Sequence, residues 1–220
     1  MPFKTLALIH TSATLVPVFA QLCKARLPGV ETFNIVDDSL VRQIGAQGAI
    51  TPDIARRVES YIHSAASGGA DQILVTCSSI GPAVEAAAPS VKIPVLRVDQ
   101  PMADLAVRTG RRIGVIATLP TTLHPTTDLV QRRAALAGRP VEVTARLCPG
   151  AFETLMEGNV AAHDQLVAAA LRELSGQVDV IVLAQASMAQ VVDYLSSTER
   201  HVPILASPPL AIDHLAKAQA

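Results

Sequence analysis

Short apolar runs alternate with longer, alanine-rich amphipathic stretches along the chain. The short runs predict buried β-strands, and the longer stretches predict helices. The expected strands are residues 6–9, 32–36, 73–76, 95–98, 113–117, 141–145, 180–184 and 204–206. The clearest expected helices are residues 52–66, 128–137 and 161–174. Strands that alternate with helices in this way are typical of an α/β fold with parallel sheets and right-handed crossovers.

The second half of the chain resembles the first. Residues 71–80 (DQILVTCSSI) match residues 179–188 (DVIVLAQASM) at an offset of 108 residues. This alignment places Cys77 on Gln185, and the same offset places His10 on Thr118. Because one offset fits several elements, we expect two halves of the same fold, related by a pseudo-twofold axis. The alternative is chance similarity, since buried parallel strands look alike in many proteins.

The repeat also predicts the domain organisation. We expect a first lobe made of residues 1–98 and 207–220, and a second lobe made of residues 99–206. Each lobe is expected to be an αβα domain with a mainly parallel four-stranded sheet. Ligands of open α/β sheets bind beyond the carboxyl ends of the strands. We therefore expect the active site in the cleft between the two lobes.

Composition narrows the class of protein. Of the 220 residues, 50% are hydrophobic and 17% are charged, which argues against a disordered chain. The net charge is −1 and no block of Lys or Arg occurs, so neither nucleic acid nor a membrane surface is an expected partner. Three widely spaced cysteines do not suggest a disulfide framework. No apolar run is long enough for a membrane-spanning helix, so the expected location is the cytoplasm.

Small hydroxyl residues gather at four of the expected strand ends. Hydroxyl and backbone N–H groups can hold a carboxylate without a charged side chain. Helix capping uses the same residue types and accounts for some of them, but it does not explain why all four ends share this chemistry. The candidate substrate-binding residues at these ends are His10, Ser12, Thr76, Ser78, Ser79, Thr118, Thr121, Gln185 and Ser187.

Cys77 is the candidate catalytic residue. It follows an apolar strand and precedes a helix that is expected to start near Ser79 or Pro82. A thiol at a helix N-terminus is stabilised as the thiolate by the helix dipole and by free N–H groups. Cys77 could therefore act as an acid/base or as a nucleophile. The alternative is a cysteine that only fills the core, which is the expected role of Cys23 and Cys148.

Motifs for metals and nucleotides are missing from the sequence. The histidines form neither an HExxH motif nor a Cys/His cluster, so no metal is expected. No GxGxxG follows a strand and no GxxxxGK[ST] occurs, so no nucleotide cofactor is expected. His10 is the one histidine at an expected strand end, where it could orient a substrate or influence the thiol.

Three motifs together resemble the aspartate/glutamate/hydantoin racemase superfamily. They are residues 74–81 (LVTCSSIG), 113–118 (IGVIAT) and 180–188 (VIVLAQASM), and they occur in the family's order. The resemblance covers essentially the whole chain. It implies two α/β domains with the active site between them, no cofactor, a small carboxylate or amino-acid substrate, and Cys77 as the first of two catalytic cysteines. Dimers are common in the family, which leaves a homo-oligomer open.

The chain departs from this family's pattern at Gln185, where the second cysteine would lie. A glutamine amide neither gives nor takes a proton near neutral pH, so a symmetric two-thiol racemisation is not expected. We expect a cofactor-independent isomerase of the racemase or epimerase type that uses the single thiol of Cys77. Three alternatives remain. The first is a lyase similar to arylmalonate decarboxylase, a relative that also keeps a single cysteine. The others are a cis–trans isomerase and a non-catalytic small-molecule-binding protein of the same fold. Gln185 would donate a hydrogen bond to a substrate oxygen.

Overall fold

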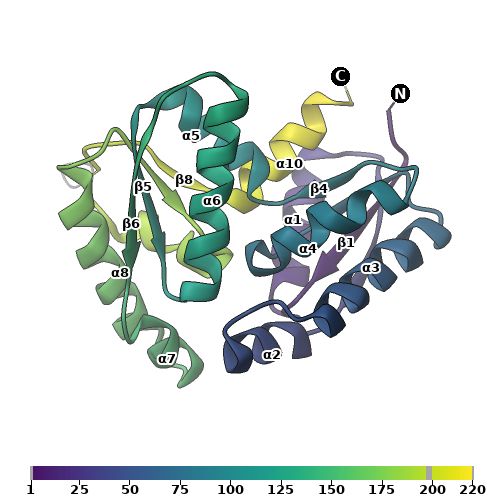
Figure 1. Ribbon diagram of the computed structural model, residues 1–220, viewed down its shortest axis with the longest axis horizontal. Coiled ribbons are helices and arrows are strands. Elements are labelled where there is room, and N and C mark those ends of the chain that lie inside the picture. Colours follow the sequence, from purple (N-terminus) through teal and green to yellow (C-terminus); the bar gives the residue numbers. More distant parts are fainter. Residues whose placement is uncertain (1, 197–199, 220) are drawn as a thin grey trace. The chain divides into compact units, whose positions relative to one another are not determined.

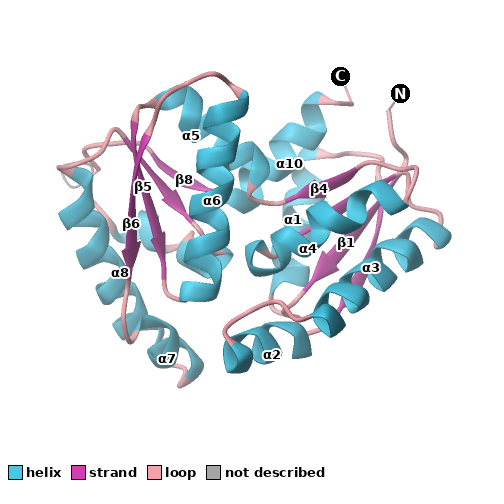
Figure 2. Ribbon diagram, in the orientation of Figure 1, coloured by secondary structure: helices cyan, strands magenta, loops and turns pink. Residues whose placement is uncertain are grey.

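The computed structural model describes residues 2–196 and 200–219 of the chain. Figure 1 traces the chain, and Figure 2 distinguishes its helices and strands. Contacts within the chain divide it into two units. Unit 1 consists of Met1–Gln100 and Pro208–Ala220, and unit 2 consists of Pro101–Ser207.

Unit 1 contains a four-stranded parallel sheet in the order β2-β1-β3-β4. Its strands are β1 (Thr5–His10), β2 (Glu31–Val36), β3 (Gln72–Val75) and β4 (Val95–Arg97). Its helices are α1 (Leu15–Arg26), α2 (Ser39–Gln47), α3 (Pro52–Ser67), α4 (Gly81–Ala87) and α10 (Ser207–Lys217), with the short 3₁₀ turns η1 (Ser78–Ile80) and η2 (Ala88–Ser90).

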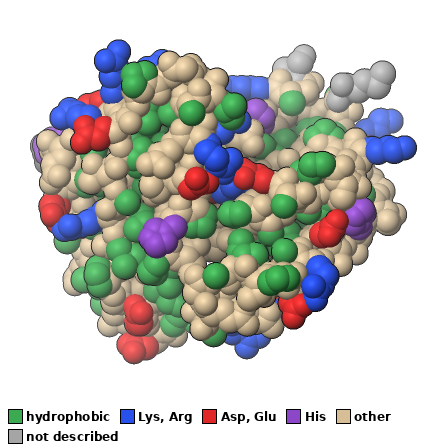
Figure 3. Space-filling view, viewed as in Figure 1, with side chains coloured by type: hydrophobic (Ala, Val, Ile, Leu, Met, Phe, Trp, Pro, Cys, Tyr) green, Lys and Arg blue, Asp and Glu red, His purple; other side chains and the backbone are tan. Residues whose placement is uncertain are grey.

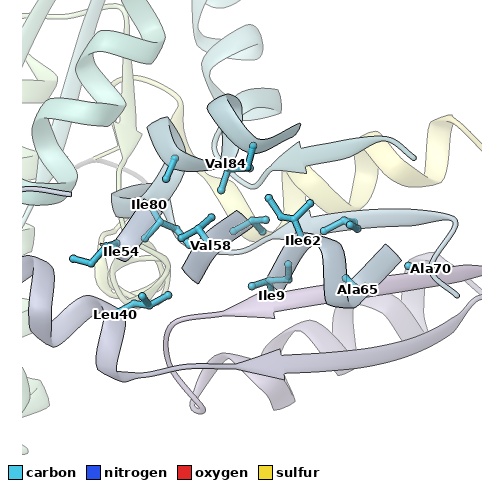
Figure 4. Close-up of a cluster of buried hydrophobic side chains, with 14 of the residues drawn as sticks. Ile9, Leu40, Ile54, Val58, Ile62, Ala65, Ala70, Ile80 and Val84 are labelled. Carbon is cyan, nitrogen blue, oxygen red and sulfur yellow. The ribbon is translucent and has the colours of Figure 1, made fainter. Parts of the chain in front are cut away.

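Helices cover both faces of this sheet because its central strands are apolar on both sides. Along β1, Ala7 and Ile9 belong to one cluster, which is completed by α2, α3 and α4 (Figure 4). Leu6 and Leu8 belong to a second cluster, which is completed by α1 and α10. The C-terminal helix α10 therefore closes the core of the unit in which the chain begins.

Unit 2 repeats this arrangement with a parallel sheet in the order β6-β5-β7-β8. The expected α/β fold with two four-stranded parallel sheets is confirmed. The strands are β5 (Arg112–Ala117), β6 (Glu142–Leu147), β7 (Val180–Leu183) and β8 (Ile204–Ala206). The helical segments are α5 (Gln100–Thr109), α6 (Pro120–Leu136), α7 (Ala151–Met156), α8 (Val160–Ser175), η3 (Ala186–Met188) and α9 (Val191–Tyr194).

The strand predictions agree with the structure to within two residues, but one helix was predicted too short. Helix α6 begins at Pro120, whereas the sequence pattern placed its start at residue 128. Proline fits the first helical position because no intrahelical partner is needed there. Pro125 lies inside the helix without ending it. The two prolines therefore belong to the helix, although they suggest a loop in the sequence.

The strand registers show where the two halves correspond. In unit 1, Leu6 of β1 pairs with Gln72 of β3. In unit 2, Ile113 of β5 pairs with Val180 of β7. The first strands therefore correspond at an offset of 107 residues and the third strands at 108. The second half has one more residue between these two strands.

This difference corrects one predicted equivalence. The offset of 108 residues placed His10 on Thr118, but the registers place His10 on Ala117 and Thr11 on Thr118. Backbone hydrogen bonds agree, because the carbonyl oxygens of His10 and Ala117 each accept from the residue that follows the neighbouring edge strand. The equivalence of Cys77 and Gln185 is unaffected, since both follow the third strands.

Charged side chains are interspersed on the face of the molecule drawn in Figure 3, where acidic groups lie near basic ones. Among the described residues, no helix combines the length and the apolar character needed to cross a membrane.

Candidate functional site

The carboxyl ends of β1 and β3 lie next to each other in unit 1. Ile9 pairs with Val75 in the parallel register. The N–H of Thr76 donates to the carbonyl oxygen of Ile9 at 2.9 Å. His10, the last residue of β1, and Thr76, the first residue after β3, are therefore neighbours at this edge of the sheet.

His10 is buried, and both of its ring nitrogens have protein partners. Nδ1 lies 2.8 Å from the hydroxyl of Thr76, and Nε2 lies 2.9 Å from Oδ1 of Asn34. Burial lowers the pKa of His10, and the hydrogen bond with Asn34 only partly offsets this effect, so the ring is mostly neutral at pH 7. A neutral imidazole has one donor and one acceptor nitrogen, and both are occupied. In this structure His10 holds Thr76 in place.

Cys77 begins the turn that follows β3. Its backbone is extended (φ −126°, ψ 120°), and it precedes η1, which runs directly into α4. The thiol is free and half-buried, and the side chain also packs against the apolar cluster of α2, α3 and α4. Ser78 and Ser79 are both buried within η1. The helix expected after Cys77 is present, and its first turn is a 3₁₀ turn.

The other two cysteines have different surroundings. Cys23 packs in the core under α1, and Cys148 packs in the core of unit 2. Burial raises the pKa of each thiol to about 11. Both therefore remain protonated near neutral pH, as expected for structural cysteines.

In unit 2, Gln185 occupies the position that Cys77 has in unit 1, and Thr118 holds its side chain. The Oε1 atom of Gln185 accepts from the backbone N–H of Thr118 at 2.6 Å and from the Thr118 hydroxyl at 3.0 Å. A backbone N–H can only donate, so this contact identifies the amide oxygen and fixes the orientation of the amide. No described residue accepts a hydrogen bond from the Nε2 group. The half-buried Gln185 therefore keeps two N–H donors for another partner.

The remaining predicted residues are less closely associated with these pairs. Ser12 is half-buried, and its hydroxyl is 2.8 Å from that of Thr14. Thr121 is half-buried in the first turn of α6, and Ser187 is exposed in η3. The structure thus joins His10 with Thr76 and Thr118 with Gln185, and it places Ser78 and Ser79 directly after Cys77.

Thr11 directly follows β1, and the sequence analysis did not include it among the candidate residues. It is 4% exposed and corresponds to Thr118 in the repeat. Within residues 2–196 and 200–219, no hydrogen bond engages its hydroxyl or its backbone N–H. The N–H and hydroxyl donors of Thr118 are used by Gln185. In unit 1 the position of Gln185 is taken by the shorter Cys77, and the corresponding donors of Thr11 are unpaired. The correct alignment of the repeat would have identified this residue.

A shallow cavity of about 370 Å³ lies elsewhere in unit 2, lined by the end of α6 and residues 138–141. These residues precede β6, so the cavity lies near the amino end of a strand. Ligands of α/β sheets bind at the carboxyl ends, where Thr118 and Gln185 lie. The cavity is therefore not part of the candidate site.

Comparison with known proteins places the chain in a family. The family model for Asp/Glu/hydantoin racemases matches residues 7–215. The chain belongs to the Asp/Glu/hydantoin racemase family. This membership confirms the resemblance found in the three sequence motifs.

Solved structures of several racemases share the fold of this family member. An aspartate racemase from Picrophilus torridus aligns with a TM-score of 0.73 and 12% identity, covering 98% of this chain and 94% of that one. A glutamate racemase from Bacillus anthracis aligns with a TM-score of 0.71 and 18% identity, covering 98% and 81%. An allantoin racemase from Pseudomonas fluorescens aligns with a TM-score of 0.66 and 17% identity, covering 97% and 89%. A search of curated protein sequences finds no match. These identities show a racemase fold, and the reaction has to be argued from the residues.

Proposed function

We propose that the protein is a cofactor-independent isomerase of the racemase or epimerase type, acting on a small carboxylate or amino-acid derivative through Cys77. The observation that carries the proposal is the contrast among the three cysteines. Cys77 lies half-buried at a strand end, whereas Cys23 and Cys148 are buried and have a pKa of about 11. Membership of the racemase family supports the same assignment.

In the proposed reaction, Cys77 supplies the base and Gln185 supplies hydrogen-bond donors. The Cys77 thiolate removes the proton from the carbon next to the substrate carboxylate, and the C–H electron pair moves into that carboxylate to form an enediolate. The two N–H groups of Gln185 donate to an enediolate oxygen and stabilise the developing charge. Return of the proton from Cys77 restores the starting configuration. Protonation of the opposite face by water inverts it, and the hydroxide formed from that water takes the proton from the Cys77 thiol, which restores the thiolate.

Neutral groups complete the proposed site. Ser78 and Thr121 carry hydroxyl groups of the kind that binds a substrate carboxylate. Thr76 and Ser79 are proposed to shape the substrate site from either side of Cys77 and Ser78, and the donors of Thr76 are already used by Ile9 and His10. Thr118 is proposed to orient Gln185 and not to bind the substrate, because both of its donors are bonded to the Gln185 amide oxygen. His10 acts through Thr76 for the same reason. Ser12 and Ser187 are proposed to bind the outer part of the substrate.

The amide at position 185 also supports a second candidate, a decarboxylase. After loss of CO₂ from a substituted malonate, a single thiol is enough to protonate one face of the resulting enolate. An amide that neither gives nor takes a proton suits this reaction better than it suits symmetric racemisation. A non-catalytic small-molecule-binding protein is the remaining alternative.

Exchange of substrate protons with D₂O tests the proposal. We expect deuterium incorporation next to the carboxylate of at least one acid in a broad panel of amino and 2-substituted acids, with complete loss in Cys77→Ser. Cys148→Ser serves as the matched control and should retain exchange. Iodoacetamide at neutral pH should modify Cys77 far faster than Cys23 or Cys148, because only about one in ten thousand thiols with a pKa of 11 is ionised at pH 7.

The outcomes separate the candidates. Exchange or inversion without gas release supports the isomerase. Release of CO₂ from substituted malonates, with formation of a single product enantiomer, supports the decarboxylase. Saturable ligand binding without exchange, inversion or CO₂ release across the panel would overturn both and leave a binding protein.

A further inference from the structure

A buried group of charges lies next to the turn that carries Cys77. Arg97 is the last residue of β4, and Val75, two residues before Cys77, is its neighbour in the sheet. Arg97 is 3% exposed and Asp99 is 0% exposed. The guanidinium donates from Nε to Oδ1 of Asp99 at 2.9 Å and from Nη2 to Oδ2 at 2.7 Å. Its Nη1 forms an ion pair at 2.9 Å with Glu85 of α4.

The two hydrogen bonds to Asp99 orient one edge of the guanidinium, and the ion pair places its other edge beside Glu85. A bidentate pair sets the distance and the angle of the two groups, and the third contact ties the same plane to α4. Burial of such a cluster is a weak source of stability, because desolvation of the charges offsets much of their attraction. Its clearest physical effect is therefore geometric: it joins the carboxyl end of β4 to the helix that follows Cys77.

Gly81 is the place where this helix rests on the guanidinium. A Cβ atom at Gly81 would lie 2.5 Å from Nε of Arg97 and would overlap the guanidinium carbon. The backbone of Gly81 is ordinary right-handed helix (φ −50°, ψ −44°), so glycine is not needed for its conformational freedom. Glycine is needed here because the Arg97 plane occupies the space of a side chain. The planar guanidinium of Arg97 is thus in direct contact with the end of the turn formed by residues 77–81.

We propose that Arg97 is a positioning residue for Cys77. Held by Asp99 and Glu85, it supports the first turn of α4 and thereby fixes the turn at residues 77–81 that carries the thiol. This inference rests on the proposed function only in assigning chemistry to Cys77. A thiol that must meet a substrate carbon needs a fixed turn, since misplacement by about 1 Å costs on the order of 100-fold in rate.

The test uses Gly81→Ala, which pushes on the Arg97 plane without removing any charge. We expect the second-order rate of Cys77 alkylation by iodoacetamide to fall by about 10-fold in the folded protein. The kcat of Cys77-dependent exchange should fall by about 10-fold or more, with a smaller change in KM. Far-UV circular dichroism and urea unfolding confirm that the variant is folded.

Two glycine controls separate positioning from general damage. Gly45→Ala introduces a methyl group into α2 where no atom lies within 4 Å, and it should leave both rates unchanged. Gly114→Ala overlaps the side chain of Leu174 in the core of unit 2. It should lower the urea midpoint as much as Gly81→Ala does, but leave Cys77 alkylation at the wild-type rate.

A double variant identifies Arg97 as the group responsible. Arg97→Lys keeps the charge but removes the planar guanidinium, so it should slow alkylation on its own. In this background, Gly81→Ala should have less than about a third of the effect that it has in the wild type, because the overlap is gone. Equal losses in the two backgrounds, or wild-type alkylation in folded Gly81→Ala, would overturn the inference. Alkylation needs no turnover, so absence of exchange in the wild type would count against the proposed function alone.

Discussion

At the scale of single residues, the two equivalent strand ends differ in whether protein atoms already use their donors. In unit 2, Thr118 gives both of its donors to Gln185 at 2.6 and 3.0 Å. In unit 1, the equivalents of these two residues are Thr11 and the shorter Cys77, and the Thr11 donors are unpaired within the described part of the chain. One end thus presents a thiol and the other presents an oriented amide, so the two units are suited to different tasks.

Replacement of Gln185 tests the task of the amide. Gln185→Glu keeps an oxygen that can accept from Thr118 but replaces the NH₂ donor by an anionic oxygen. We expect Cys77-dependent exchange to fall by about 100-fold, within the range observed when one donor to a developing oxyanion is removed. Deuterium incorporation measured by NMR gives the rate. Gln185→Ala should lose less, because it removes the donor without adding a repulsive charge.

The alkylation rate of Cys77 is the control for these variants and should stay at the wild-type value in both. Exchange at the wild-type rate in Gln185→Glu would show that the amide does not contact the reacting carboxylate.

Residue-level contacts were the part of the site that the sequence could predict least. Cys77 and its hydroxyl neighbours could be selected because they follow an apolar strand. The engagement of His10 by Asn34 could not, since it depends on two strands in register at positions 24 residues apart. A strand-end histidine suggests an available base, whereas burial and two ring contacts make it a support for Thr76.

At the scale of elements, one carboxylate ties β2 to the two helices that follow it. Asp37 lies directly after β2, and Arg57 and Tyr61 lie on α3. Asp37 accepts from the Tyr61 hydroxyl at 2.6 Å, from the hydroxyl of Ser39 at 2.6 Å and from Arg57. Burial by itself would raise the pKa of Asp37, but the bonds from Ser39, Tyr61 and Arg57 outweigh it and lower the pKa.

Asp37→Asn should therefore destabilise the protein in a pH-dependent way. Each donor would face an amide that can accept with only one of its two ends, and we expect a loss of about 1–3 kcal/mol at pH 7. Because the folded-state pKa is below the unfolded value, the stabilisation by Asp37 is present above the unfolded pKa and is lost as the pH falls through the folded pKa. Urea unfolding at pH 7 and at pH 3 measures the difference, which should shrink at pH 3.

Asp128→Asn is the matched control, since Asp128 forms an exposed ion pair with Arg132 within α6. It should change stability by less than about 0.5 kcal/mol at either pH. A difference between Asp37→Asn and wild type that stays constant from pH 7 to pH 3 would contradict the proposed role of the ionised carboxylate.

The extents of most elements followed from the sequence because buried parallel strands are short, continuous apolar runs. The start of α6 did not, because Pro120 and Pro125 look like helix-breaking residues. The structure resolves this by placing Pro120 at the first helical position, where its missing N–H has no consequence. Local composition alone could not show that the helix continues through Pro125.

At the scale of the whole molecule, the internal repeat was visible in the sequence, but its alignment was wrong by one residue at the first strand. Apolar strands constrain an alignment weakly, since neighbouring positions carry similar residues. The hydrogen-bond registers fix it, because Leu6 pairs with Gln72 whereas Ile113 pairs with Val180. In the corrected alignment, the residue equivalent to Thr118 is Thr11 and not His10.

The corrected repeat makes a prediction about Thr11. Its equivalent Thr118 donates both hydrogen bonds to an amide oxygen, so the same two groups in Thr11 are suited to donate to a substrate oxygen in that place. Thr11→Val keeps the shape of the side chain and removes the hydroxyl. We expect KM for the carboxylate substrate to rise by about 10-fold, which corresponds to the loss of one hydrogen bond to a charged group.

Two comparisons decide whether this rise reports substrate binding. Cys77 alkylation should be unchanged in Thr11→Val, because the thiol and its turn are not altered. Ser12→Ala removes a hydroxyl that is proposed to contact only the outer part of the substrate and is already bonded to Thr14, so it should raise KM less than Thr11→Val does. If Ser12→Ala raised KM as much as Thr11→Val, the one-residue shift between the two halves would have no bearing on the site. If Thr11→Val alone has the effect, the two halves hold an oxygen at corresponding positions, one from Gln185 and one from the substrate.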